Sequence, residues 1–279
     1  MIIDTHLHLV DRTALTYPWL SDTPPLDRDW SLALYAEEAA ALGITQALHM
    51  EVDVAAGDIE RETAHVKELS PKGGVTLIGA IAACRPEDEG FAAYLEEVTA
   101  DPFVRGLRRI LHQSADDLSE SALFRENIRR LEGHRLPFDL CVLPRQMPQV
   151  TALVDQAPGA RFVLDHCGVP DIKAGALDPW RAGIKTMAER PNVVAKISGV
   201  IAYADGPNWT AETLKPFVHH VIECFGWDRL VWGSDWPVCT LGGGLTRWVN
   251  ATHELVAGAS EAEKAKLFRE NAVRVWDLG

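Results

Sequence analysis

The sequence alternates between short apolar segments rich in β-branched residues and longer segments with helical periodicity. We predict strands at 2–9, 44–52, 75–82, 104–110, 137–143, 161–166, 193–198 and 229–235. Helical periodicity lies between them, at 30–42, 57–70, 88–100, 119–133, 146–157, 178–190 and 210–225, and a helical region at 247–276 closes the chain. This alternation is typical of parallel strands joined by crossover helices. Eight such units in 279 residues predict a single-domain (β/α)8 TIM barrel over residues 1–279.

An open, doubly wound α/β sheet is the alternative architecture for the same alternation. Such a sheet normally carries a glycine-rich phosphate loop after its first strand. Here the first strand is followed by His8-Leu9-Val10-Asp11, which contains no glycine. The barrel is therefore the fold that we expect.

Composition narrows the range of partners. The chain is 47% hydrophobic, and its formal charge of -13 argues against nucleic acid or an anionic membrane surface, since both require basic patches. No stretch approaches the roughly 20 apolar residues that a membrane span needs, and no leader-like segment opens the chain, so we expect a cytoplasmic protein. The five scattered cysteines are predicted to be free thiols, and Cys167 to be a small buried residue rather than a nucleophile.

The segment from residue 11 to residue 29 is rich in proline, tryptophan and aspartate. Long irregular connections after a strand commonly form lids or walls of binding sites, and we predict that role here. Trp19 either lines the pocket or caps the core; the sequence favours neither.

Two histidines lie two residues apart at the end of the first strand. In a strand, alternate side chains share a face, so Asp4, His6 and His8 are expected to point together. The two imidazoles would then form half of a site for a metal ion or for a carbonyl group.

Catalytic groups of (β/α)8 barrels lie at the carboxyl ends of the strands. Reading those ends from this sequence gives His6, His8, Glu51, Arg108, His112, Asp139, His166, Lys196, Ser198 and Asp235. Ionisable residues dominate where a core would be apolar. We therefore predict one active site at this rim.

Three motifs carry a resemblance to a known family. They are Asp4-Thr5-His6-Leu7-His8, Leu164-Asp165-His166 and Trp232-Gly233-Ser234-Asp235-Trp236-Pro237, with lesser matches at Gly106-Leu107-Arg108-Arg109, at Phe138-Asp139-Leu140 with Pro144-Arg145, and at Lys196-Ile197-Ser198-Gly199. Over essentially the whole chain the sequence resembles the amidohydrolase superfamily. Within it, the sequence looks like the branch of lactonases that act on sugar lactones such as fuconolactone and rhamnonolactone, on pyrone dicarboxylate or on sulfomuconolactone.

The resemblance implies lactone hydrolysis, which needs an activated water, a polarised carbonyl and a proton for the ring oxygen. We assign the water and the proton to Asp235, and the carbonyl to His6, His8 and His166. A structural N-cap is the alternative role for Asp235. Metal-rich members of the superfamily carry a lysine on strand four and further histidines on strands five and six. Arg108 and Asp139 stand at those places here, so a binuclear centre is not expected.

The sequence leaves open whether the site binds a single metal ion. His6, His8, His166 and Asp235 would satisfy the ligand preferences of one Zn²⁺, with Glu51 as a possible further ligand. The branch that the chain resembles also includes lactonases without a metal requirement, in which the histidines act directly on the carbonyl. Both alternatives remain.

Substrate contacts are predicted for Arg108, Glu51, Asp139, Lys196, Trp19 and Trp236. Arg108 would anchor a carbonyl or carboxylate oxygen through its guanidinium, and Glu51 would accept a substrate hydroxyl or pair with Arg108. Lys196 would add positive charge at the oxyanion or pair with Asp139. One cationic pair favours a neutral sugar lactone, whereas an anionic ring would recruit a further arginine, for which Arg145 is the candidate.

Three functions are compatible with this set of residues. The first is a hydrolase that opens a sugar (aldono-) lactone. The second keeps the barrel but performs metal-dependent decarboxylation or amide hydrolysis on a small carboxylated ring, and chelator sensitivity would distinguish it. The third is a carbohydrate or metal binder without turnover. The complete set of acid and base groups favours the first.

Overall fold

A computed structural model describes residues 1–69 and 71–279 and shows eight parallel strands in a nearly closed barrel. The strands are β1 (Ile2–Leu7), β2 (Ile44–Met50), β3 (Thr76–Ala83), β4 (Val104–Ile110), β5 (Phe138–Cys141), β6 (Phe162–Leu164), β7 (Val193–Ile197) and β8 (Leu230–Trp232). They pair in chain order. The predicted (β/α)8 barrel is confirmed.

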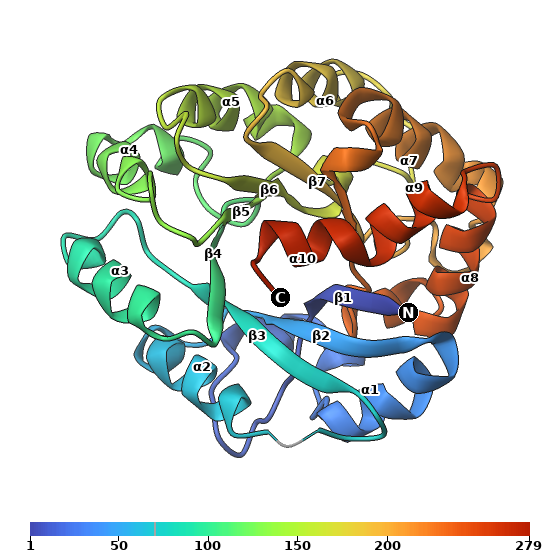
Figure 1. Cartoon of the computed structure of the whole chain (residues 1–279), viewed down its shortest axis with the longest axis horizontal. Coiled ribbons are helices and arrows are strands. Elements are labelled where there is room, and N and C mark those ends of the chain that lie inside the picture. Colours follow the sequence, from blue (N-terminus) through green and yellow to red (C-terminus); the bar gives the residue numbers. More distant parts are fainter. Residues whose placement is uncertain (70) are drawn as a thin grey trace.

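Helices surround the barrel in the same order (Figure 1). They are α1 (Leu32–Ala39), α2 (Ile59–Lys67), α3 (Phe91–Ala100), α4 (Ala122–Arg129), α5 (Met147–Asp155), α6 (Trp180–Ala188), α7 (Ala211–Phe225), α8 (Leu245–Leu255), α9 (Glu261–Ala265) and α10 (Asn271–Val275). Local chemistry sets several of their ends: the Ser31 hydroxyl accepts from the Leu34 amide at the start of α1, and Gly43 follows the 3₁₀ turn after α1 in the left-handed conformation, with φ 76°. The predicted helical region 247–276 is broken into α8, α9, a π turn and α10.

The lower half of the barrel interior is apolar. Ile3, Leu48, Ile81, Val163 and Val231 pack together there. The same cluster includes Ala272, Val275 and Trp276 from the end of the chain, so α10 closes the amino-terminal mouth of the barrel. In Figure 1, α10 crosses the centre of the ring at this end.

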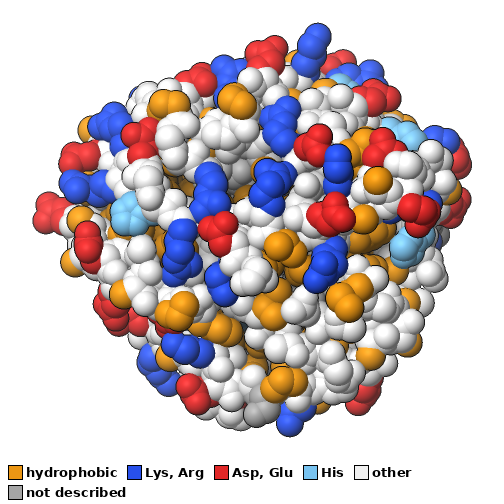
Figure 2. Space-filling view, in the orientation of Figure 1, with side chains coloured by type: hydrophobic (Ala, Val, Ile, Leu, Met, Phe, Trp, Pro, Cys, Tyr) orange, Lys and Arg blue, Asp and Glu red, His pale blue; other side chains and the backbone are white. Residues whose placement is uncertain are grey.

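Arginine side chains fasten this lower end. Arg105, Arg161 and Arg274 donate hydrogen bonds to the main-chain carbonyls of Asp277, Val275 and Asp228, respectively. Figure 2 shows this face, with cationic and anionic side chains intermixed over it. These three arginines therefore have a structural role, because they satisfy main-chain carbonyl groups at the ends of elements.

The first and last strands meet through a few specific bonds rather than a regular ladder. The Asp235 amide donates to the His6 carbonyl at 2.9 Å, and the His8 amide donates to the Trp236 carbonyl at 2.8 Å. One carboxylate oxygen of Asp4 accepts from the Ser234 amide at 2.8 Å and from the His6 amide at 3.0 Å. These bonds set β1 and the segment after β8 side by side.

The prediction that Asp4, His6 and His8 share a face is wrong for Asp4. Its second carboxylate oxygen accepts from the Tyr35 hydroxyl of α1 at 2.5 Å, in the layer between barrel and helices. Ile3 instead belongs to the inner cluster. The pairing of β1 with β2 shifts register between Asp4 and Leu7, so the two-residue alternation breaks before His6.

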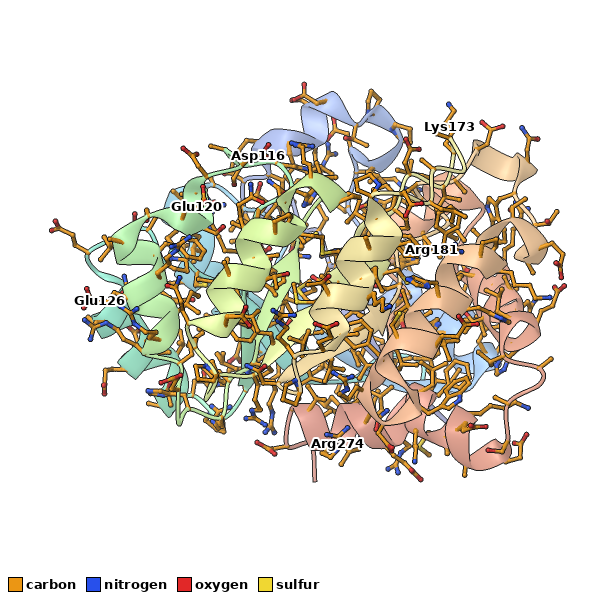
Figure 3. All side chains as sticks on the ribbon, turned by 90° about the horizontal axis from the view of Figure 1, so that it is seen from above. Asp116, Glu120, Glu126, Lys173, Arg181 and Arg274 are labelled. Atoms are coloured by element: carbon orange, nitrogen blue, oxygen red, sulfur yellow. The ribbon has the colours of Figure 1, made fainter. Side chains whose placement is uncertain are left out.

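The segment at 11–29 folds back over the carboxyl end of the barrel and contains two 3₁₀ turns, Pro18–Asp22 and Pro24–Leu26. In the side view of Figure 3 this pale-blue segment lies at the same end as Lys173, opposite Arg274 and α10. Among the described residues, no helix is both long and apolar enough to cross a membrane.

Candidate active site

A cavity of about 330 Å³ opens at the carboxyl end of the barrel. One wall is apolar and comes largely from the 11–29 segment and from the residues after β8; it contains Trp19, Leu20, Leu26, Trp30, Val238 and Leu241. The lining also includes the polar or ionisable side chains of His8, Asp53, Arg108, His112, Gln113, His166, Tyr203 and Asp235. The cavity thus offers a ligand both apolar surface and polar groups.

Asp235 lies at the centre of the polar side. Its Oδ1 atom is 3.5 Å from Nε2 of His8, 3.7 Å from Nε2 of His6 and 4.0 Å from Nε2 of His166. Asp235 follows β8 with φ 57°, and His166 follows β6 with φ 53°. Both strands end earlier than predicted, and the left-handed residues turn these side chains back over the barrel.

The hydrogen bond on the far side of His8 fixes its tautomer. Nδ1 of His8 lies 3.0 Å from the Met50 carbonyl, which can only accept, so Nδ1 carries the proton and Nε2 presents a lone pair. That lone pair faces a carboxylate oxygen of Asp235. The other oxygen, Oδ2, is buried without a hydrogen-bond partner among the described residues. Hydrogen-bond acceptors of His8 and Asp235 therefore converge on one point of the cavity, where a hydrogen-bond donor such as water would bind.

His166 is held by its own local partners. Nδ1 of His166 lies 2.9 Å from the Ser198 hydroxyl. Gly199 has φ 68°, and a Cβ atom there would lie 2.7 Å from Cγ of His166. Position 199 therefore needs glycine for its backbone conformation and for the close approach of the imidazole.

A buried ionic network lies beneath the imidazoles. Nζ of Lys196 is 2.7 Å from Asp139, 2.8 Å from Asp165 and 3.2 Å from Nδ1 of His6. All four side chains are fully buried. Because an isolated buried charge is costly, the paired carboxylates are what allow Lys196 to remain an ammonium inside the barrel.

Arg108 and Glu51 form a second pair beside this network. Arg108 donates through Nε to Glu51 Oε1 at 2.6 Å and through Nη2 to the Glu51 carbonyl at 2.7 Å. Its Nη1 lies 3.3 Å from Nε2 of His6. All three guanidinium nitrogens therefore face protein groups.

The electrostatics of the site keep the imidazoles neutral and raise the pKa of the Asp235 carboxyl group toward neutral pH. Burial lowers the pKa of His8 to about 3 and that of His166 to about 4. Burial raises the pKa of Asp235 to about 6. Burial also opposes ionisation of Asp165, but the adjacent Lys196 ammonium outweighs it, so the pKa of Asp165 is lowered well below its usual value.

The structure brings most of the predicted site residues together. His8, His166, Asp235, Arg108 and Trp19 line the cavity. His6, Glu51, Asp139 and Lys196 are buried below its surface and touch the lining residues or one another.

Trp236 and Arg145 are placed elsewhere. The Trp236 ring packs on Trp30 and Tyr35, with centroid separations of 5.2 and 5.3 Å, and does not line the cavity. Arg145 is exposed and pairs with Asp116 at 2.8 Å, also outside the lining.

Several lining residues were not among the predicted site residues. Asp53 and Gln113 each follow a predicted rim residue by one or two positions, a signal that could have found them. Tyr203 lies in the connection after β7, where no motif marked it. The cysteines agree with expectation: all five are free, and Cys167 is fully buried, where burial raises the pKa of its thiol to about 12.

The donor set fits one divalent metal ion. Ligand atoms of His6, His8 and Asp235 lie within 4.8 Å of one another, and so do those of His6, His166 and Asp165. The lone pair on His8 and the unpartnered oxygen of Asp235 are the donors that Zn²⁺ accepts. Glu51 points to Arg108 and is not part of either set.

Comparison with known proteins places these features in a family. The profile of the family described as Amidohydrolase matches residues 3–278. An L-fucono-1,5-lactonase of Burkholderia multivorans is 30% identical over 99% of this chain and 96% of its own length. A 4-sulfomuconolactone hydrolase of Rhizobium radiobacter is 28% identical over 84% of this chain and 75% of its own length. A crystal structure of a Burkholderia multivorans amidohydrolase with bound zinc superposes with a TM-score of 0.87 over all of both chains, at 25% identity.

Proposed function

We propose that this chain, which belongs to the amidohydrolase family, is a hydrolase that opens the ring of a neutral sugar lactone. The observation that carries the proposal is the convergence of one buried carboxylate, Asp235, with three neutral imidazoles at the floor of a cavity. The lactonases among its relatives support the choice of reaction.

The attacking water would lie above His8 and Asp235, within hydrogen-bond distance of both. The two acceptor atoms are 3.5 Å apart, and a water above them can donate one proton to each. Asp235 then takes its proton as the oxygen attacks the carbonyl, while His8 orients the water. An Asp235 pKa near 6 leaves the group ionised at neutral pH yet basic enough to act.

His166 would polarise the carbonyl. If the Ser198 hydroxyl donates to Nδ1 of His166, Nε2 carries the proton and faces the cavity beside Asp235. A donor placed there stabilises the negative charge that develops on the carbonyl oxygen. Asp235 then returns its proton to the departing ring oxygen, which completes ring opening.

A divalent metal held by His6, His8, His166 and Asp235 would, when bound, supply a Lewis acid and lower the pKa of a bound water. Lys196 would continue to neutralise Asp165 below the imidazoles.

The charge of the cavity favours a neutral substrate. Among the described lining residues, Arg108 is the one Lys or Arg, and its nitrogens are engaged by Glu51 and face His6. Asp53 and Asp235 place two carboxyl groups on the same lining. A dicarboxylate or sulfonated ring would meet repulsion without a free guanidinium to offset it.

A lactone panel followed by proton release tests the proposal, with and without chelator. We expect turnover of 1,5- and 1,4-aldonolactones well above their spontaneous hydrolysis, and little with pyrone dicarboxylate. Absence of turnover on every lactone, with folding verified by circular dichroism, would refute it. Turnover of a carboxylated aromatic with release of CO₂ would instead establish decarboxylation.

A further inference from the structure

The two residues after β2, Val52 and Asp53, are held in place by three separate side chains. The Val52 amide donates to Glu62 of α2 at 2.8 Å, and the Val52 carbonyl accepts from the Trp19 indole at 2.8 Å. The Asp53 amide donates to Glu51 at 2.8 Å. Glu62 and Glu51 are both buried. Three side-chain hydrogen bonds thus fix the main chain of Val52 and Asp53, more than in an ordinary surface turn.

Asp53 has a left-handed backbone conformation, with φ 47°. Within the described parts of the chain, the other non-glycine residues with positive φ are His166, Cys167, Val169, Asp235 and Asp277. Two of these, His166 and Asp235, line the cavity, as Asp53 does. Strained backbone conformations that the surroundings enforce are concentrated at functional sites. Asp53 has such a conformation, as do Asp235 and His166 at the centre of this site.

The carboxylate of Asp53 retains acceptor capacity on the cavity wall. About a third of its side chain is exposed, and its nearest cation, Arg85, is 3.6 Å away, beyond a direct hydrogen bond. Among the described residues, no hydrogen bond is donated to this carboxylate. Other buried carboxylates of the site differ, since Glu51 and Asp139 each accept from a cationic side chain at 2.7 Å or less.

We infer that Asp53 selects the substrate by accepting hydrogen bonds from ring hydroxyl groups of an uncharged polyhydroxylated lactone, an assignment that rests on the proposed function. A carboxylate is a strong acceptor for vicinal hydroxyls, and its charge repels an anionic ring. The ring hydroxyl groups would face Asp53, while the C–H groups of the ring would contact apolar side chains of the cavity lining.

The test uses Asp53→Gly, because glycine adopts the left-handed conformation without strain and the variant is expected to fold. For L-fucono-1,5-lactone we expect kcat/KM to fall about 10- to 100-fold, mainly through KM, as one or two charge-assisted hydrogen bonds are lost. For δ-valerolactone, the same ring without hydroxyls, kcat/KM should change less than about twofold. The Tm should not fall.

Asp277→Gly is the matched control. Asp277 also has a left-handed conformation, with φ 50°, and lies at the opposite end of the barrel. The same substitution there should leave kinetics on both lactones unchanged. Equal losses on both lactones for Asp53→Gly, or a fall in Tm beyond that of the control, would mean that Asp53 is structural and would overturn the inference.

Failure of the proposed function gives a different result. If the wild type opens no lactone, calorimetry with a polyhydroxylated δ-lactam still measures recognition. Weaker lactam binding by Asp53→Gly than by wild type supports Asp53 as a hydroxyl acceptor even then. Equal binding by the two proteins, or binding by neither, rejects that role.

Discussion

Asp235 and His166 combine strained backbone with catalytic geometry. Both follow short strands in left-handed conformations, with φ 57° and 53°. Such conformations cost free energy unless the surroundings enforce them. Asp235 is held by the bond from its amide to the His6 carbonyl, and His166 by Ser198 and the close approach of Gly199. The positions of these side chains are therefore built into the backbone.

Asp235→Asn should abolish most activity while leaving the fold intact. Asparagine tolerates the left-handed conformation, but its amide cannot take a proton from water. We expect kcat to fall about 10²- to 10⁴-fold, the usual contribution of a general base. Asp277→Asn, at another left-handed aspartate, is the control and should retain wild-type kcat. Equal activity of Asp235→Asn and the wild type in a proton-release assay would exclude Asp235 as the base.

The pH dependence should report the carboxyl group of Asp235. Burial raises the pKa of Asp235 to about 6, so the group is protonated and inactive below that pH. We expect kcat/KM, corrected for spontaneous hydrolysis, to rise about tenfold per pH unit below 6 and to level off above pH 7. The imidazoles should not add a second step there, because burial lowers the pKa values of His8 and His166 to about 3 and 4. A profile flat from pH 4.5 to 8 would contradict this assignment.

Gly199→Ala should disable the site through His166. The added Cβ atom would lie 2.7 Å from Cγ of His166, and φ is 68°. Gly43→Ala is a control, since Gly43 is left-handed with φ 76° and has nothing within 4 Å of the added atom. Both variants should lose about 1–2 kcal/mol of unfolding free energy to the left-handed conformation. Only Gly199→Ala should lose kcat by tenfold or more, as kinetics and denaturation together would show.

At the scale of single residues, motif and position at strand ends predicted much of the polar side of the cavity. His8, His166, Asp235 and Arg108 follow from these signals. Tyr203 does not, because it lies in a connection whose course depends on tertiary contacts. Trp236 shows the converse: it adjoins Asp235 in sequence, but Trp30 and Tyr35 bury its ring in the layer behind the cavity.

At the scale of elements, β1 carries the site through an irregularity. A regular strand would place Asp4 with His6 and His8, yet the register shift turns Asp4 toward α1. The order and type of the elements could be predicted from periodicity. The register shift could not be predicted, because it depends on hydrogen bonds from Asp4 to Tyr35 and Ser234, which are distant from it in the sequence.

Tyr35→Phe tests this linkage between α1, β1 and the segment after β8. Removal of the hydroxyl leaves Oδ2 of Asp4 buried without its hydrogen bond, and we expect a loss of about 1–3 kcal/mol in unfolding free energy. Tyr94→Phe removes a hydroxyl bonded to the Ala83 carbonyl in a part-buried place and should cost less. If urea denaturation shows Tyr35→Phe to be as stable as the wild type, the bond does not join the elements.

At the scale of the whole molecule, the barrel interior is divided into layers. Apolar side chains and α10 fill the lower part, the ion network of Lys196 lies above them, and the imidazoles and the cavity lie on top. The network separates a layer that provides stability from a layer that provides chemistry, because rigid ion pairs fix His6 from below. This division predicts that substitutions in the lower layer change stability but not activity.

Leu48→Ala tests that separation. Leu48 is fully buried in the lower cluster with Ile3 and Val231, and truncation leaves a cavity that the barrel cannot fill by relaxation. We expect a loss of about 2–5 kcal/mol in unfolding free energy, measured by urea denaturation. Under conditions where the variant is fully folded, kcat and KM should stay within about twofold of wild type. A tenfold fall in kcat of the folded variant would show that packing below the ion network is transmitted to Asp235, and that the two layers act as one unit.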